Sequence, residues 1–341
     1  MLEKPDLEDE RLKATLVDGY GLRVTDLTFL PLGADVNTAV YRANAEDGRA
    51  YFVKLRRGTP DEMSVAVPAC LGEQGIEHII APIRTTTGRL WGRLEPFTVI
   101  LYPFVAGADG YEMTLSVSQW VELGAALARI HMASLPDALK RGLPRESYSA
   151  QWREQARTFQ SQLRATTYDD PVAAELAETM RARAAMVTQL VEAAEQLGQA
   201  VQGRALEEIL CHGDLHAGNL LLGQDGALYI VDWDTAVLAP KERDLMFVGS
   251  GLGPGWDQPQ ATAWFYQGYG PTTIDAVALA YYRCERIVQD IVEFCKQVLA
   301  TRGDSQDRRQ ALRYLTSQFR PNGVVEIALQ SYAAALPATR K

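Results

Sequence analysis

The fold of this chain is decided by two stretches, CHGDLHAGN at residues 211–219 and IVDWD at residues 230–234. Between them, short apolar runs flank the sequence GQDG at residues 223–226, a pattern typical of a tight β-hairpin. Such a hairpin would bring Asp214, Asn219 and Asp232 close together. The two stretches therefore predict a polar site with two carboxylates and one amide.

Two carboxylates and an amide at this spacing are typical of phosphoryl transfer. In kinases, an aspartate of the catalytic loop accepts the proton of the acceptor hydroxyl, and an asparagine five residues later holds Mg²⁺. A second aspartate, after the next hairpin, holds the metal ion that bridges the phosphates. Asp214, Asn219 and Asp232 match these roles in that order. Their oxygen atoms suit Mg²⁺, a hard ion whose octahedron is completed by nucleotide oxygens and water.

Three further side chains belong to these stretches. His216 lies where protein kinases carry a phosphate-contacting lysine, so we predict that it contacts the transferred phosphate. His212 is expected to order the loop by hydrogen bonding. Asp234 is either a third acidic ligand or the N-cap of the next segment. A His-x-Asp triplet alone would fit an ordinary turn, but the full constellation favours the phosphoryl-transfer interpretation.

The first hundred residues predict three successive strands, at residues 23–30, 38–43 and 50–55. Lys54 lies near the end of the third strand, where kinases place the cation for the α- and β-phosphates. Taken alone, such a lysine also fits a strand residue whose ammonium group reaches the surface.

The turn between the first two strands contains one glycine, Gly33. Backbone N–H groups from Gly33 to Thr38 can cradle phosphate, with Asn37 or Thr38 adding a side-chain donor. Ordinary turn chemistry explains the same residues equally well.

A helix is predicted over residues 59–75, because Thr59 can cap it and Pro60 suits its first position. Glu62 in its first turn is the predicted ion-pair partner of Lys54, with Glu73 as the alternative. Early acidic residues also serve simply to complement the helix dipole.

The apolar segment at residues 98–107 predicts a strand that ends in a hinge. Pro103 would break a central strand ladder, whereas a hinge needs only one carbonyl acceptor and one N–H donor for adenine. We therefore predict that the Pro103 carbonyl accepts from adenine and that the Val105 N–H donates to it.

Together these features resemble the aminoglycoside phosphotransferases of the protein-kinase-like superfamily, in particular the spectinomycin phosphotransferases. Besides the two stretches already quoted, the resemblance lies in GAD at residues 33–35, YPF at 102–104, LAPKERDLMF at 238–247, YYR at 281–283 and ERIV at 285–288. It spans nearly the whole chain. It implies a two-lobed α+β protein-kinase-like fold with a small β-rich nucleotide lobe, residues 1–103, and a larger helical lobe, residues 104–341, that holds the catalytic loop and the substrate cleft.

The resemblance also implies a reaction, the ATP- and Mg²⁺-dependent O-phosphorylation of an aminocyclitol antibiotic, with spectinomycin as the first candidate. Phosphorylation would inactivate the drug. Glu285 and Asp290, on a helix predicted over residues 274–300, then become candidates for binding the cationic substrate. Without the resemblance, an ordinary solvated helix face is favoured. Other helices are expected at residues 116–134 and, as a pair broken near residues 169–171, at 148–197.

Composition excludes several classes of protein. The chain has 34 basic and 43 acidic side chains and a net charge of −9, which argues against nucleic-acid binding. Its four cysteines are scattered and suggest neither zinc nor disulfides. Since neither a signal sequence nor a membrane span is apparent, we expect a cytoplasmic protein. The sequence does not indicate an oligomeric state.

Two alternatives to the spectinomycin assignment remain open. The same phosphate machinery serves kinases of other small hydroxylated metabolites, such as choline, an amino alcohol or a sugar. A nucleotide-binding pseudoenzyme would bind ATP without turnover, but the presence of Lys54, Asp214, Asn219 and Asp232 argues against it.

Overall fold

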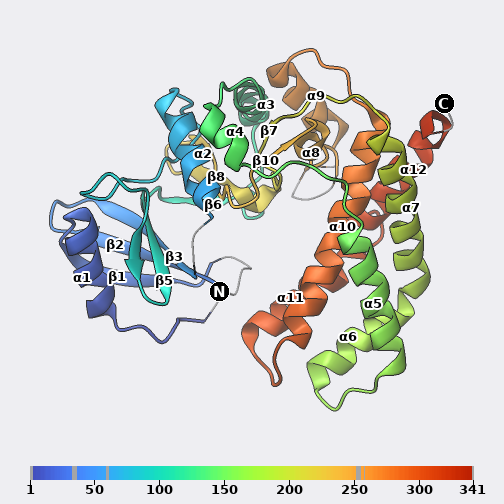
Figure 1. Ribbon diagram of the computed structural model, residues 1–341, viewed down its shortest axis with the longest axis horizontal. Coiled ribbons are helices and arrows are strands. Elements are labelled where there is room, and N and C mark those ends of the chain that lie inside the picture. The colour runs from blue at the N-terminus through green and yellow to red at the C-terminus, as the bar shows by residue number, and fades with distance from the viewer. Residues whose placement is uncertain (1–2, 33–36, 59–60, 251–254, 257, 340–341) are drawn as a thin grey trace. The chain divides into compact units, whose positions relative to one another are not determined.

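A computed structural model describes residues 3–32, 37–58, 61–250, 255–256 and 258–339 (Figure 1). The strands in this part are β1 (Val24–Leu30), β2 (Thr38–Ala45), β3 (Ala50–Arg57), β4 (Gly92–Leu94), β5 (Phe97–Pro103), β6 (Gly107–Asp109), β7 (Ile209–Cys211), β8 (Leu220–Gly223), β9 (Leu228–Ile230) and β10 (Val237–Ala239). The helices are α1 (Asp9–Tyr20), α2 (Glu62–Glu73), α3 (Val117–His131), α4 (Asp137–Gly142), α5 (Gln151–Ala165), α6 (Pro171–Ala182), α7 (Ala184–Gln202), the 3₁₀ turn η1 (Ala217–Asn219), α8 (Glu242–Leu245), α9 (Pro259–Tyr269), α10 (Ala276–Leu299), α11 (Gln306–Gln318) and α12 (Val324–Thr339).

The chain divides into two compact units. The strand-rich unit consists of residues 1–113, 132–144 and 218–236, and the helical unit consists of residues 114–131, 145–217 and 237–341. The division therefore differs from a single boundary after residue 103. The strand-rich unit includes residues 218–236 because β6, which follows β5 in sequence, pairs with β8.

The strand-rich unit is built on a five-stranded antiparallel sheet in the order β1-β2-β3-β5-β4. One face of this sheet is covered by α1, whose Leu12 and Leu16 are fully buried against Tyr41, Val53 and Val99 (Figure 1). Buried and polar residues alternate along β3. Lys54 therefore lies on the opposite face of this strand from the buried Val53 and Leu55. The three strands predicted near the N-terminus are confirmed.

The predicted hairpin after the motif is also confirmed. Strands β8 and β9 pair antiparallel, with Leu220 opposite Ile230 and Leu222 opposite Leu228. Gly226 in the turn has a φ of 86°, which is favourable only for a residue without a Cβ atom. The N–H of Val231 donates to the carbonyl of Asn219 over 2.9 Å, so the residue before Asp232 is tied to the end of the catalytic motif.

The helical unit is organised around α10, which packs against α5, α7, α11 and α12. Figure 1 shows α7 alongside α10 over most of its length. The helix begins where the side chain of Asp275 accepts hydrogen bonds from the N–H groups of Val277 and Ala278, both over 2.9 Å. Thus α10 agrees with the helix predicted over residues 274–300.

Two other helix predictions need correction. Residues 148–197 form parts of three helices, not two, because α6 and α7 are separated at Arg183. Neither glycine nor proline marks this break, so the sequence carries no signal for it. The helix predicted from Thr59 begins at Glu62, with Asp61 accepting from the N–H of Met63 over 3.0 Å; Thr59 and Pro60 lie outside the described residues. None of the helices in the described ranges combines the length and the apolar character that crossing a bilayer requires.

Candidate phosphoryl-transfer site

The candidate catalytic loop, residues 212–216, follows β7 in the helical unit. Asp244 holds the start of the loop, since its carboxylate accepts from the backbone N–H groups of His212, over 2.8 Å, and Gly213, over 2.7 Å. Gly213 has a φ of 82°, so a residue with a Cβ atom would be strained here. The His212 ring accepts from the N–H of Asp214 over 3.3 Å, which agrees with the prediction that His212 orders the loop.

Asp244 is buried with no exposed surface. His131 contacts it, and Tyr269 contacts His131 in turn. His131 Nε2 lies 3.0 Å from Asp244 Oδ2, and His131 Nδ1 lies 2.7 Å from the Tyr269 hydroxyl. Burial alone would raise the pKa of Asp244, but the hydrogen bond from His131 and the neighbouring charges lower it below its usual value. Asp244 is therefore an ionised carboxylate with two backbone donors, and the loop geometry depends on it.

Asp244, His131 and Cys211 also have ligand atoms within 4.8 Å of one another, the arrangement of a possible metal site. The carboxylate, however, already accepts two backbone N–H groups, and burial raises the pKa of Cys211 well above its usual value. A neutral thiol is a poor metal ligand. We interpret the cluster as the support of the catalytic loop.

Asp214, in the same unit, has basic side chains as neighbours. Arg286, on α10, forms an ion pair with Asp214 Oδ1 through its Nη1 atom, and the Nε2 atom of His216 lies 3.8 Å from the same oxygen. Burial alone would raise the pKa of Asp214, but the charges of Arg286 and of the neighbouring histidines lower it below its usual value. Asp214 is thus present as a carboxylate, which can accept a hydrogen bond from a hydroxyl group.

In the strand-rich unit, Lys54 lies between two carboxylates. Its Nζ atom is 2.8 Å from Asp232 Oδ1 and 2.9 Å from Asp234 Oδ2, and Arg56 Nη1 is 2.9 Å from Asp234 Oδ1. Burial alone would lower the pKa of Lys54, but the charges of Asp232 and Asp234 raise it above its usual value. Asp234 therefore contacts two cations, and it is not the N-cap of a described helix.

The backbone of Asp232 adopts a φ of 64°, a left-handed conformation that costs energy for a residue with a side chain. Such strain is concentrated at functional sites, where the surrounding structure enforces it. Here it accompanies the ion pair of Asp232 with Lys54.

The donor set of this cluster fits a hard divalent cation. Asp232 and Asp234 contribute carboxylate oxygens, and the carbonyl of Asn219 is tied to Val231, the residue before Asp232. The ammonium group of Lys54 lies at hydrogen-bond distance from both carboxylates, so the two oxygens already converge on a positive charge. In this chain Asn219 and Asp232 would hold Mg²⁺, with Asp234 as a further oxygen ligand.

Several predicted site residues have other surroundings. The proposed ion pair of Lys54 with Glu62 is absent, because Glu62 is exposed in the first turn of α2 and Lys54 binds Asp232 and Asp234 instead. Its alternative, Glu73, pairs with Arg84 over 2.9 Å. These two predictions about Lys54 are therefore wrong for the structure described here.

The candidate substrate residues on α10 also need correction. Glu285 is only 4% exposed and forms an ion pair with Arg153 over 2.6 Å, so it belongs to the core of the helical unit and not to a substrate surface. Asp290 lies 2.9 Å from Arg286 and accepts from Gln318 over 3.2 Å. Asp290 therefore contacts Arg286, the partner of Asp214.

The predicted nucleotide-binding backbone is described only in part. Gly33 lies outside the described residues. Asn37 is exposed and its carbonyl accepts from Arg57 N–H over 2.9 Å, and Thr38 begins β2. Pro103 ends β5, and Val105 lies between β5 and β6. Their roles toward phosphate and adenine remain predictions.

Sequence reasoning missed two cations of the site. Arg56 follows Lys54 by two residues and so shares its face of β3, a signal that strand alternation provides. Arg286 precedes Asp290 by four residues, the spacing at which helical side chains meet. Both signals were present in the sequence, but neither identifies the distant carboxylate that the cation binds.

Comparison with known proteins identifies the family of the chain. Residues 28–279, well over half of the chain, match the model of the phosphotransferase enzyme family named APH. The chain belongs to this phosphotransferase family. The predicted protein-kinase-like fold, with a β-sheet lobe and a helical lobe, is confirmed by the structural matches below.

The chain is similar to the spectinomycin phosphotransferase APH(9)-Ia, whose structure in complex with ADP and spectinomycin matches with a TM-score of 0.89 and 37% sequence identity. That match covers 96% of this chain and 99% of the other. A second structure of APH(9)-Ia, bound to AMP, matches with a TM-score of 0.84 and 37% identity over 94% of this chain and 98% of that one. The protein StrN of Streptomyces griseus is 27% identical over 224 residues, which cover 64% of this chain and 67% of StrN.

Proposed function

We propose that this phosphotransferase transfers the γ-phosphoryl group of ATP to a hydroxyl group of an aminocyclitol antibiotic, with spectinomycin as the first candidate, and thereby inactivates it. The observation that carries the proposal is the 37% identity to APH(9)-Ia over nearly the entire length of both chains. The ionised Asp214 and the Lys54–Asp232–Asp234 cluster supply the side chains that such a transfer needs.

Each group then has a distinct role. Asp214 accepts a hydrogen bond from the acceptor hydroxyl and orients it for attack on the γ-phosphorus, and His216 contacts the transferred phosphate. Lys54 binds the nucleotide phosphates. When Lys54 leaves Asp234 to do so, the ion pair with Arg56 keeps Asp234 in place. Asn219 and Asp232 would hold Mg²⁺, which when bound would supply neutralisation of the phosphate charge. The hinge residues Pro103 and Val105 hold adenine, and Asn37 and Thr38 contribute to phosphate binding.

The acceptor is tested by a panel assay. Mg²⁺- and ATP-dependent phosphate incorporation is measured with spectinomycin, streptomycin, kanamycin, hygromycin, choline and methylthioribose, and the Asp214→Ala variant serves as the control. We expect a product with spectinomycin that the variant does not form. A product with another acceptor only would overturn the antibiotic assignment and leave the phosphotransfer site intact.

A second candidate function is the phosphorylation of another small hydroxylated metabolite. It is favoured because proteins named as kinases of different small molecules share this fold at 13–18% identity. They are amicoumacin kinase, a microcompartment-associated aminopropanol kinase and a choline/ethanolamine kinase family protein. At that identity the likeness concerns the fold alone. A nucleotide-binding pseudoenzyme is the remaining alternative, and it predicts nucleotide binding without any product in the panel.

Lys54→Ala is expected to weaken the use of nucleotide. A hydrogen bond to a charged group contributes about 1.5–3 kcal/mol, which corresponds to a rise in the KM for ATP of roughly 10- to 100-fold. Steady-state kinetics at varied ATP measures the effect. The matched control is Lys13→Ala, a lysine of α1 whose partner is Glu10, and it should behave like the parent. An unchanged KM and kcat in Lys54→Ala would remove Lys54 from the site.

A further inference from the structure

One guanidinium group in the helical unit lies between two carboxylates, one of which is the candidate catalytic residue. Arg286 pairs with Asp214 through Nη1, and its Nε atom lies 2.9 Å from Asp290 Oδ1, one turn further along α10. The side chains of Arg286, Asp214 and Asp290 are only 15%, 20% and 15% exposed. A charge pair shielded from water in this way is screened much less than a surface pair.

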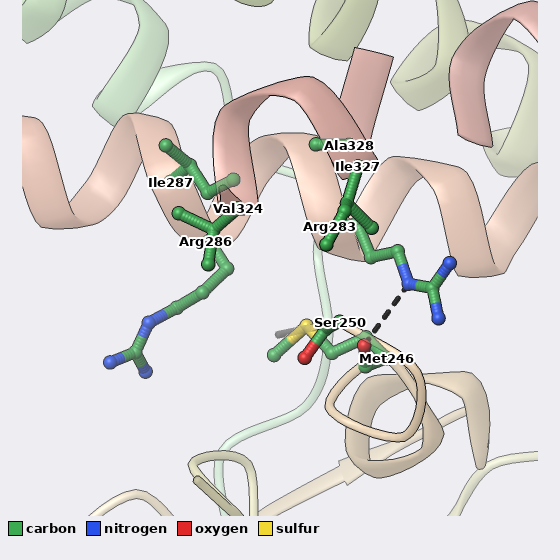
Figure 2. Close-up of a pocket in the computed structure, with 8 residues that line it drawn as sticks. All are labelled: Met246, Ser250, Arg283, Arg286, Ile287, Val324, Ile327 and Ala328. Carbon is green, nitrogen blue, oxygen red and sulfur yellow. Dashed lines mark hydrogen bonds between the residues drawn. The ribbon is translucent and has the colours of Figure 1, made fainter. Parts of the chain in front are cut away.

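The position of Arg286 is fixed from several sides. Its guanidinium lies 5.7 Å from the centre of the Phe247 ring, and Gln318 of α11 donates to Asp290 over 3.2 Å. Its aliphatic stem borders a small cavity that Ile287, Val324 and other residues line. Figure 2 shows that the guanidinium groups of Arg286 and Arg283 leave this cavity in opposite directions. The stem is thus packed while the charge is directed to Asp214.

We infer that Arg286 is a positioning residue for phosphoryl transfer: braced by Asp290, it fixes the Asp214 carboxylate in the orientation in which Asp214 meets the acceptor hydroxyl. The inference rests on the proposed function for the role of Asp214. Arg286 and Asp290 act through Asp214 and not by contact with the substrate.

The chemistry of the transfer is compatible with a weak base at this position. The new bond between the acceptor oxygen and the γ-phosphorus forms while the bond from that phosphorus to the leaving oxygen of ADP breaks. In a loose transition state the attacking oxygen carries little positive charge until late, so the hydroxyl proton leaves late and early removal gives little advantage. What the reaction needs from Asp214 is a fixed, ionised acceptor.

All charged groups around Asp214 bear on its protonation. Arg286 and Asp290 face it from α10, His212 and His216 from its own loop, and Arg243 from α8. Burial favours the protonated form, and Arg286 is the strongest opposing charge. Without Arg286, burial would be opposed only by the weaker charges, so the pKa of Asp214 would rise.

The first measurement is independent of any substrate. The carboxyl ¹³C signal of Asp214, assigned by its loss in Asp214→Asn, is followed by NMR as the pH is lowered in the parent and in Arg286→Met. An opposite charge within a few ångströms lowers a carboxyl pKa by about one to three pH units. We therefore expect the midpoint of the titration to rise by that amount in Arg286→Met. Arg286→Lys should restore most of the difference, and Asp290→Asn should give a smaller change.

The second measurement is the pH dependence of kcat/KM with the acceptor that the panel identifies. Because activity requires ionised Asp214, the acidic limb of the profile should move to higher pH in Arg286→Met, in step with the NMR midpoint. At neutral pH the loss should be about 10²-fold, the size expected when a reacting group is misplaced by about 1 Å. A residue with a purely structural role would lower the amount of folded enzyme without moving the acidic limb.

Arg283→Met is the matched control. Arg283 lies on the same helix and lines the same cavity, but it donates to the carbonyl groups of Met246, over 3.1 Å, and Val248, over 2.6 Å, and has no contact with Asp214. Its loss should lower the melting temperature and leave the titration of Asp214 unchanged.

The outcomes separate the inference from the proposed function. An Asp214 midpoint that is the same in the parent, Arg286→Met and Arg286→Lys would overturn the inference, whatever the substrate is. If the midpoint rises as expected but spectinomycin is not phosphorylated, the spectinomycin assignment falls and the inference stands. If Arg286→Met does not fold, Arg286→Gln, which keeps a polar side chain without the charge, decides instead, since an unchanged midpoint and pH profile in that variant would contradict the role of the braced guanidinium.

Discussion

Replacing Asp214 by alanine is expected to lower kcat by about 10²- to 10⁴-fold, the range over which a group that accepts a proton in the transition state contributes. The physical reason is that alanine cannot accept a hydrogen bond from the acceptor hydroxyl, so the nucleophile is neither oriented nor relieved of its proton. Nucleotide binding should change little, because Lys54 and Asp232 belong to the other compact unit of the chain. Single-turnover kinetics and calorimetric binding of ATP measure the two effects separately.

Asp169→Ala is the matched control for this prediction. Asp169 is an exposed aspartate of the same unit, between α5 and α6, and its loss should leave both kcat and nucleotide binding unchanged. Turnover by Asp214→Ala at the parent rate would exclude Asp214 from the reaction. A parallel loss of nucleotide binding would instead indicate that the variant is misfolded.

The second large effect is expected for Asp244→Ala. The change leaves the buried N–H groups of His212 and Gly213 without their acceptor and His131 without its carboxylate partner. Leaving a buried donor without its acceptor typically costs about 1–3 kcal/mol of the free energy of unfolding for each donor. Urea unfolding followed by circular dichroism measures this loss, and the loosened loop should also lower kcat.

Asp244→Asn is the milder variant, since its amide oxygen can still accept one of the two backbone N–H groups. It should lose less stability than Asp244→Ala. Because the pKa of Asp244 is below its usual value in the folded protein, its stabilising effect should be complete near neutral pH and be lost only as the pH falls through that lowered pKa. Parent-like unfolding of Asp244→Ala would show that the loop is held by other contacts.

The sequence was most informative where the physical cause is local. The hairpin around Gly226, the helix cap at Asp275 and the alternation on β3 each depend on residues a few positions apart, and each could be predicted. The motif at residues 211–219 also depends on near neighbours. By contrast, nothing in residues 181–185 indicates the single-residue break at Arg183 between α6 and α7.

The partners of the site residues could not be predicted in the same way. Lys54 and Asp232 are 178 positions apart, and Arg286 and Asp214 are 72 apart. Which carboxylate a cation meets at such a separation depends on the packing of whole elements. The position of Glu62 in the first turn of the next helix therefore does not make it the partner of Lys54. Because Glu285 is acidic, the sequence suggests a surface position for it. An acidic residue on an amphipathic helix can nevertheless point into the core when it forms an ion pair there, as Glu285 does with Arg153.

The division of the chain also bears on the order in which the protein can assemble during synthesis. The strand-rich unit takes its last segment, residues 218–236, from between two segments of the helical unit, residues 145–217 and 237–341, and β6 pairs with β8 from that segment. In a nascent chain that ends before Gly218, β6 therefore lacks its partner strand β8. Translation must pass residue 236 before the strand-rich unit is complete, so residues 114–131 and 145–217 of the helical unit are synthesised before the strand-rich unit can finish folding.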